Sequence, residues 1–240
     1  VQGGAMNAGL NSTKLGLSGM PKAMEEIAVA RLVRLAKLTG AKVHVCHVSS
    51  AGSVEIVRWA KARGVRVTCE TAPHYFTLTD DAVTTFDTNA KMNPPLREAE
   101  DVAAIKEGLQ DGSIDCIATD HAPHTPTEKD VEFDYAPFGI VGLETSLGLV
   151  VTELVEPGIL TMEQAIRLMT WAPAQILDLP AGKLEQDGPA DVTVFDPHAE
   201  WTVAPETFLS RSRNTPFAGR VLRGQVKAAL CDGRFAYREA

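Results

Sequence analysis

The stretch CIATDHAPH, residues 116–124, combines residue types that together could carry out chemistry. An apolar run beginning at Cys116 ends in a carboxylate, Asp120, which is followed by imidazoles at His121 and His124. Imidazole and carboxylate are ligands of Zn²⁺, and a catalytic zinc site keeps one position open for water. Such a site activates water near neutral pH, and a neighbouring carboxylate can accept its proton. The stretch therefore predicts metal-assisted hydrolysis, provided that other segments supply further ligands.

Similar polar residues end three other β-branched or apolar runs of the sequence. They are His44 and His47 in 42–50, His74 in 65–75, and Lys91, Asn93 and Arg97 in 88–97. The runs alternate with segments of helical periodicity, which predicts βαβ units and a parallel sheet. Ligands of α/β folds bind where the carboxyl ends of the strands meet. The strand-end histidines and Asp120 therefore predict a zinc-type site at that edge.

Several of these residues also have a structural interpretation. His44 lies between two valines, which favours a structural role, and His121 is as suited to orienting a loop as to touching substrate. His198 lies away from the strand ends and is expected on the surface. Lys91 and Arg97 flank a Pro-Pro turn, where they either bind a substrate anion or face solvent.

Composition limits the class of protein. The chain has 240 residues, of which 45% are hydrophobic and 22% charged, enough for one large domain or a domain with a smaller lobe. The net charge of -8 argues against nucleic acid or an anionic membrane as a partner. No apolar run approaches the roughly 20 residues of a membrane span, and no signal peptide is recognisable. The cysteines are scattered without a CxxC pair, which predicts a reducing cytoplasm.

The hydrophobic periodicity predicts an α/β region followed by a β lobe. Helices are expected over 21–39, 53–63, 98–110, 142–155 and 161–177, and strands over 42–50, 65–75, 88–97 and 113–124. No glycine-rich nucleotide motif follows a strand. Residues 1–180 therefore predict either part of a closed (β/α)₈ barrel or an open doubly wound sheet. Residues 181–240 predict a small lobe of short strands.

The chain carries, in this order, the motifs HVCHVSS, TCETAPHYFTLT, KMNPPLR, DCIATDHAPH, APFGIVGLET and NTPF. Together they resemble dihydroorotases of the longer bacterial type, in the cyclic amidohydrolase branch of the amidohydrolase superfamily. ATDHAPH alone is also compatible with allantoinases and hydantoinases, whereas KMNPPLR and PFGIVG favour dihydroorotase. The resemblance covers essentially the whole chain.

The resemblance implies a fold, an activity and a metal. The fold is the C-terminal part of a (β/α)₈ TIM-like barrel followed by part of a small β-sandwich lobe. The activity is the reversible cyclisation of N-carbamoyl-L-aspartate to L-dihydroorotate in pyrimidine biosynthesis, with one or two Zn²⁺ in a complete site. By motif, His47 and His74 match the histidines of one zinc site. Asp120 matches the aspartate that binds the other zinc and shuttles the proton.

The resemblance also implies substrate contacts. Asn93 and His124 match substrate-contacting positions, and the backbone at Pro137, Phe138 and Gly139 matches a segment beside the pyrimidine ring. Residues 125–136 match a mobile loop, and we expect them to be exposed, to lack apolar anchors other than Val131 and Phe133, and to act as a lid.

The sequence departs from the family pattern in its first strand. The HxHxR motif and the bridging carboxylate of the family do not occur, so the resemblance predicts an incomplete, inactive fragment. One alternative is another cyclic amidase of the allantoinase or hydantoinase type. A second is a non-catalytic subunit that partners aspartate transcarbamoylase. A homodimer is also compatible with the sequence.

Overall fold

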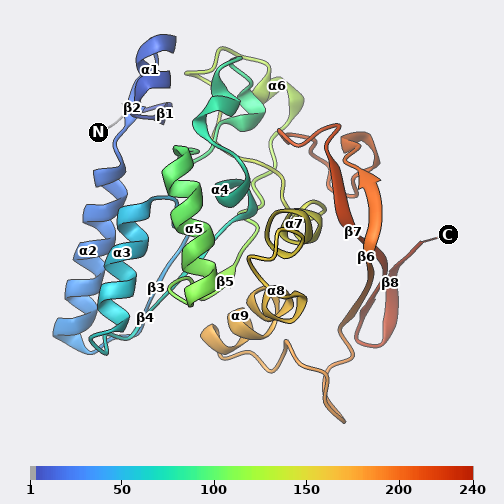
Figure 1. Cartoon of the computed structure of the whole chain (residues 1–240). Helices are drawn as coiled ribbons and strands as arrows, with labels where there is room; N and C mark the ends of the chain where they lie inside the picture. The colour runs from blue at the N-terminus through green and yellow to red at the C-terminus, as the bar shows by residue number, and fades with distance from the viewer. Residues whose placement is uncertain (1–3, 240) are drawn as a thin grey trace.

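Parallel strands alternate with helices in the first half of the chain (Figure 1). The computed structural model describes residues 4–239. Three short strands form a sheet in the order β3-β4-β5, and both pairings are parallel. They are β3 (Val43–Val45), β4 (Val67–Thr71) and β5 (Cys116–Ile117). They lie within the predicted strands 42–50, 65–75 and 113–124, which are longer because their polar ends are loops.

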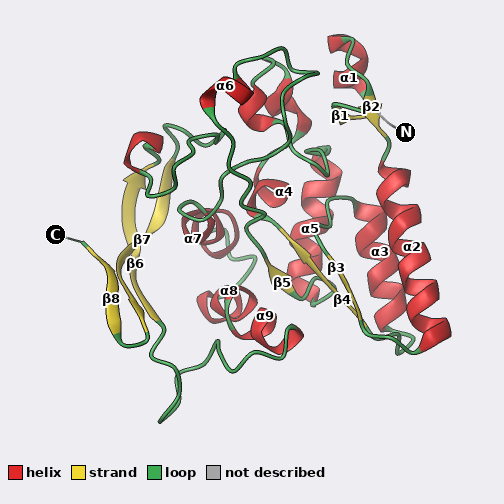
Figure 2. Ribbon diagram, turned by 180° about the vertical axis from the view of Figure 1, so that it is seen from behind, coloured by secondary structure: helices red, strands yellow, loops and turns green. Residues whose placement is uncertain are grey.

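Helices from the first half of the chain lie together on one side of this sheet (Figure 2). They are α2 (Lys22–Thr39), α3 (Ala51–Lys61) and α5 (Ala99–Asp111), which confirms the predicted helices 21–39, 53–63 and 98–110. Val33, Val57 and Ile105 from the helices are fully buried against Val67 and Cys69 of β4. Because side chains alternate along a strand, Thr68 and Glu70 point to the opposite face, where they are only partly buried.

The prediction of a strand over residues 88–97 was wrong. A 3₁₀ turn, η2 (Thr88–Ala90), is followed by irregular chain. Pro94 and Pro95 have no N–H group to donate to a neighbouring strand. A second 3₁₀ turn, η1 (Asp80–Val83), precedes it.

Two predicted helices are divided in the structure. The segment 142–155 contains α7 (Ser146–Val150) and the π-helical turn η3 (Val151–Val155). The segment 161–177 contains α8 (Met162–Met169) and α9 (Trp171–Ile176), separated at Thr170. Pro173 lacks the N–H group that would continue the ladder of the preceding helix into this turn. No helix between residues 4 and 239 has the length and hydropathy that a membrane crossing requires.

The C-terminal region forms an antiparallel sheet beside α7 (Figure 1). Its strands are β6 (Val192–Thr202), β7 (Val221–Cys231) and β8 (Arg234–Arg238), and a 3₁₀ turn, η4 (Pro205–Thr207), follows β6. Gly148 of α7 permits the close contact, because a Cβ there would lie 3.0 Å from the side chains of Leu222 and Trp201. The absence of a side chain at this position brings the helix and the sheet together.

The N-terminal segment is fastened to the sheet by Arg97. This segment contains β1 (Met6–Asn7), α1 (Leu10–Leu15) and β2 (Gly19–Met20). The Arg97 guanidinium is 3% exposed and donates to Asn7 Oδ1 at 3.0 Å, to the Met20 carbonyl at 2.8 Å and to Ser49 Oγ at 3.1 Å. Its Nη2 lies 3.5 Å from Glu25 Oε2. Arg97 therefore has a structural environment, and neither the solvent-facing nor the anion-binding interpretation holds.

We expect Arg97→Met to lower the free energy of unfolding by about 2–4 kcal/mol, because it removes the buried donor that Asn7, Met20 and Ser49 share and leaves the partly buried Glu25 carboxylate without its cation. Urea unfolding followed by circular dichroism measures the change. Arg31→Met, on the exposed side of the same helix as Glu25, is the control and is expected to change stability by no more than about 0.5 kcal/mol. Equal stability of the two variants would contradict the prediction.

Candidate functional site

The polar residues that follow β3, β4 and β5 meet at the carboxyl edge of the sheet. His47 Nε2 lies 3.5 Å from Asp120 Oδ1. His74 lies on the short helix α4 (Pro73–Thr77), directly after β4, and is near enough for the His47 charge to lower its pKa. Within residues 4–239, however, the ligand atoms of these three residues do not all lie within 4.8 Å of one another. The three predicted residues lie near one another, but their ligand atoms are too far apart to bind one metal ion in this arrangement.

Two of these residues have an unusual backbone conformation. His47 has a φ of 59° and Asp120 a φ of 46°, in the left-handed region that residues other than glycine seldom adopt. Strained backbone of this kind persists where the surrounding structure enforces it, and it clusters at active sites. The conformation turns the chain sharply at the end of each strand, at the point where the two side chains approach each other.

Glu70 of β4 is part of the site, although it was not among the predicted residues. Its Oε1 lies 3.1 Å from His47 Nδ1, and its Oε2 lies 3.2 Å from His44 Nε2. Burial raises the pKa of Glu70, but the close contacts with both imidazoles outweigh burial and lower it to about 2. The contact with Glu70 raises the pKa of His47 against the effect of burial. The alternation of Thr68 and Glu70 in β4 was the signal that could have identified this residue.

His44, for which the sequence favours a structural role, lies beside Glu70. Its Nδ1 lies 2.8 Å from Thr68 Oγ1, and its Nε2 contacts the same carboxylate as His47. Because His44 pairs with Thr68 across parallel strands, its side chain shares the uncovered face with Glu70. His198, as expected, is exposed on β6, in a different sheet.

Three buried polar atoms at this edge have no hydrogen-bond partner. They are His47 Nδ1, whose contact with Glu70 lacks hydrogen-bond geometry, His74 Nε2 and Asp120 Oδ2. Burial lowers the pKa of His74 to about 3, so the ring is neutral. Burial also raises the pKa of Asp120, with His47 opposing and Glu70 adding to the effect. Neutral imidazole and carboxylate are zinc ligands, and buried polar atoms normally have partners. The residues present therefore fit a metal ion.

The predicted substrate-contacting residues lie in neighbouring loops. His124 Nε2 lies 2.9 Å from the Phe138 carbonyl, and the Gly139 amide donates to the Lys91 carbonyl at 2.9 Å. Asn93 is exposed, two residues beyond Lys91. Gly139 has a φ of 150°, and a Cβ there would lie 2.7 Å from the Ala122 Cβ. A glycine is therefore required for this close approach of the two loops.

Asn214, in the NTPF motif, joins these loops. Its Nδ2 donates to the carbonyls of Ala122 at 2.9 Å and Gly139 at 3.0 Å, and its Oδ1 accepts the His124 amide at 3.0 Å. Its own carbonyl accepts the Val141 amide at 3.0 Å. Asn214 is 4% exposed, so these bonds form in a dry environment where each is strengthened. No local pattern predicts this role, because its partners lie far away in the sequence.

The segment 125–136 is largely exposed but is anchored. Val131 is 41% exposed and does not anchor it, whereas Phe133 is 4% exposed. Lys129 of α6 (Pro126–Lys129) is also buried, and so is Lys91, which contacts the segment from outside. The expectation that Val131 and Phe133 are the apolar anchors holds for Phe133 and is wrong for Val131, since Ala136 is buried instead. The solvent or substrate-anion environments considered for Lys91 are not found.

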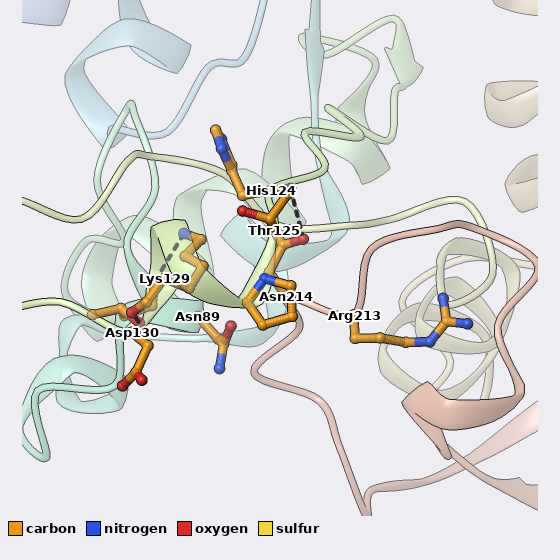
Figure 3. A pocket seen from close by; sticks show the side chains of 9 residues that line it. Asn89, His124, Thr125, Lys129, Asp130, Arg213 and Asn214 are labelled. Carbon is orange, nitrogen blue, oxygen red and sulfur yellow. Dashed lines mark hydrogen bonds between the residues drawn. The ribbon is translucent and has the colours of Figure 1, made fainter.

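A cavity of about 330 Å³ lies beside His124 (Figure 3). Asn89, Lys129 and Asp130 lie on one side of it, and Arg213 lies on the other. His47, His74 and Asp120 are not among the residues that line it. The cavity therefore adjoins the loops around His124 and is separate from the strand ends.

Known proteins with similar sequences include dihydroorotases of bacteria. The chain is 57% identical to a dihydroorotase of Pelotomaculum thermopropionicum over 99% of this chain and 56% of that protein. It is 57% identical to a dihydroorotase of Geotalea daltonii over 98% of this chain and 55% of that protein. The chain thus spans about half the length of the curated relatives that it matches.

Solved structures of cyclic amidases are also similar. A dihydropyrimidinase from Brevibacillus agri is 26% identical with a TM-score of 0.85, over 89% of this chain and 48% of that chain. An L-hydantoinase from Arthrobacter aurescens is 29% identical with a TM-score of 0.85, over 90% of this chain and 49% of that chain. The model of the amidohydrolase family matches residues 10–236. The chain belongs to the amidohydrolase family.

Proposed function

We propose that the protein containing this chain is a dihydroorotase, which interconverts L-dihydroorotate and N-carbamoyl-L-aspartate. The observation that carries the proposal is 57% identity to a protein named dihydroorotase over 99% of this chain. The structural neighbours named as a dihydropyrimidinase and an L-hydantoinase are less similar, at 26% and 29% identity. The specific motifs KMNPPLR and PFGIVG are both retained.

The proposed architecture is part of a (β/α)₈ barrel over residues 1–180, followed by part of a β lobe over residues 181–240. Two observations support it. The parallel strands alternate with helices α2, α3 and α5, which pack against the sheet as helices do around a barrel. The face opposite the helices carries the polar residues Thr68 and Glu70.

His47 and His74 are the proposed ligands of one zinc ion, and Asp120 is the proposed ligand of a second or shared ion. Bound zinc would supply Lewis-acid polarisation of the amide carbonyl and activation of water. The unpartnered atoms His74 Nε2 and Asp120 Oδ2 support this assignment. Glu70 supports it further, because its contact with His47 Nδ1 fixes the orientation of that ring.

Asp120 is the proposed proton carrier of the reaction. Ring opening adds water to the ring carbonyl, breaks the amide C–N bond and leaves a proton for the departing nitrogen. Asp120 takes this proton from water and returns it to the nitrogen. Asn93, His124 and the backbone of Pro137, Phe138 and Gly139 are the proposed substrate contacts.

A reducing compartment such as the cytoplasm is consistent with the cysteines. All four are free thiols, and Cys46 and Cys231 are exposed. Exposed thiols persist unpaired where the surroundings are reducing.

We expect Asp120→Asn to lower kcat for dihydroorotate ring opening by at least about 10²-fold, because general acid–base transfer contributes 10²–10⁴-fold. The substitution keeps the size of the side chain and removes its ability to carry the proton. A steady-state assay of carbamoyl-aspartate formation from dihydroorotate measures the rate in the complete protein.

His198→Asn is the matched control, since His198 is exposed on β6, and it should keep the unmodified rate. Parallel assays with hydantoin and allantoin test the alternative activity. Faster opening of either ring than of dihydroorotate would replace the proposed substrate, and full activity of Asp120→Asn would remove its proposed role.

We expect His74→Ala to weaken zinc binding by at least about tenfold, because even residues that only orient a metal ligand contribute 10–100-fold to affinity. Competition with a chromophoric chelator measures the affinity, with the His198→Ala variant as the control. Unchanged affinity in His74→Ala would show that the buried imidazole is structural.

A further inference from the structure

Two buried lysines lie beside the proposed substrate loops without belonging to the proposed catalytic set. Lys91 is 2% exposed and Lys129 is 6% exposed. Burial lowers the pKa of both groups, and for Lys129 the neighbouring Lys91 charge adds to the effect and brings it to about 8. Burying an ammonium group is unfavourable unless hydrogen bonds replace its hydration. The hydrogen-bond partners of the two ammonium groups therefore indicate their role in the structure.

Lys129 lies near the start of the segment 125–139. It links this segment, including Pro137 near its end, to Thr88. Its Nζ donates to the Thr88 carbonyl at 2.9 Å and to the Pro137 carbonyl at 2.8 Å. The Thr88 hydroxyl returns a hydrogen bond of 2.6 Å to the Lys129 carbonyl. Figure 3 shows the Lys129 side chain beside the cavity, on the same side as Asn89. Thr88 and Lys129 thus hold each other through reciprocal hydrogen bonds.

Lys91 holds the middle of the same segment. Its Nζ donates to the Phe133 carbonyl at 2.7 Å and to the Asp134 carbonyl at 3.0 Å. The ammonium also lies 4.7 Å from the centroid of the Phe138 ring, within range of a cation–π interaction. The Lys91 carbonyl accepts the Gly139 amide at 2.9 Å. One residue therefore contacts both the exposed loop and the proposed substrate-contacting segment.

We propose that Lys91 and Lys129 are positioning residues that fix segment 125–139 against residues 88–91 and thereby place Phe138 and Gly139 for substrate binding. This inference rests on the proposed function for its effect on the substrate. The hydrogen-bond pattern supports it, because the acceptors belong to Thr88 and to three positions in or beside the loop, Phe133, Asp134 and Pro137. Such hydrogen bonds orient a main chain without depending on its side chains.

The effect on the loop is tested by amide hydrogen exchange in the complete protein. Lys91→Met and Lys129→Met keep the length of the side chain and remove the donors. We expect exchange at the Tyr135, Ala136 and Gly139 amides to become at least about tenfold faster, since each variant removes hydrogen bonds from a charged donor that hold the segment in place. Thr88→Val is a milder variant that removes only the reciprocal bond and is expected to accelerate exchange about threefold.

Lys42→Met is the matched control for these variants. Lys42 also donates to a main-chain carbonyl, that of Ile176, at 2.9 Å, but it lies away from the segment. It should leave exchange at Tyr135, Ala136 and Gly139 unchanged. Should either methionine variant fail to fold, Thr88→Val still decides the question. Exchange at the unmodified rate in the folded variants would overturn the proposal.

The effect on substrate is tested by steady-state kinetics with dihydroorotate. We expect KM to rise about tenfold in Lys129→Met while kcat changes by less than about threefold, because the displaced groups bind substrate and do not transfer its proton. A loss of fold alone lowers the amount of active enzyme, and so lowers apparent kcat at constant KM.

The two measurements distinguish failure of this inference from failure of the proposed function. Faster exchange with unchanged KM would overturn the role in substrate placement. No turnover of dihydroorotate by the unmodified, zinc-loaded complete protein would overturn the proposed function, and the exchange measurement would still decide whether the lysines hold the segment.

Discussion

The parallel pairing of β3, β4 and β5 is the constraint on which the candidate site depends. Val45 lies opposite Cys69, and Glu70 lies opposite Cys116, so the strands end at one edge and His47 meets Asp120 there. Helices bury one face of the sheet, and the alternation of side chains directs Glu70 to the other. A shift of one residue in register would exchange the two faces, which would bury the Glu70 carboxylate among apolar side chains and dismantle its contacts.

The site has local energetic costs that the surrounding structure offsets. His47 and Asp120 both have positive φ values, and strain of this kind costs about 1–3 kcal/mol per residue. His74 Nε2 and Asp120 Oδ2 are buried without a partner, and each such group costs about 1–3 kcal/mol more. A well-packed core on the helical face of the sheet makes these costs tolerable. A metal ion at the edge would satisfy the unpartnered atoms, so the same features that weaken the fold would strengthen metal binding.

The sequence predicted the parts of the molecule that depend on local periodicity. Helices α2, α3 and α5 follow from apolar spacing, and the strand ends follow from abrupt changes to polar residues. The segment 88–97, predicted as a short strand broken by Pro94 and Pro95, contains no strand, because its prolines cannot donate to a ladder. The roles of Lys129 and Asn214 depend on which segments become neighbours in space, and most of their partners are main-chain groups. The sequence does not show which main-chain groups will become neighbours.

This difference divides the candidate site into two parts with different physical bases. At the strand ends, the capacity to bind a metal ion depends on side chains, because His74 and Asp120 have buried atoms without a partner. Around the proposed substrate loops, the arrangement depends on main-chain groups, because Asn214 binds the carbonyls of Ala122 and Gly139 and the amide of His124. Main-chain groups cannot be altered by ordinary substitution, so only the residues that hold them in place can shift them. Changes in substrate preference within this architecture are therefore expected to arise from such supporting residues as well as from residues that touch the ring.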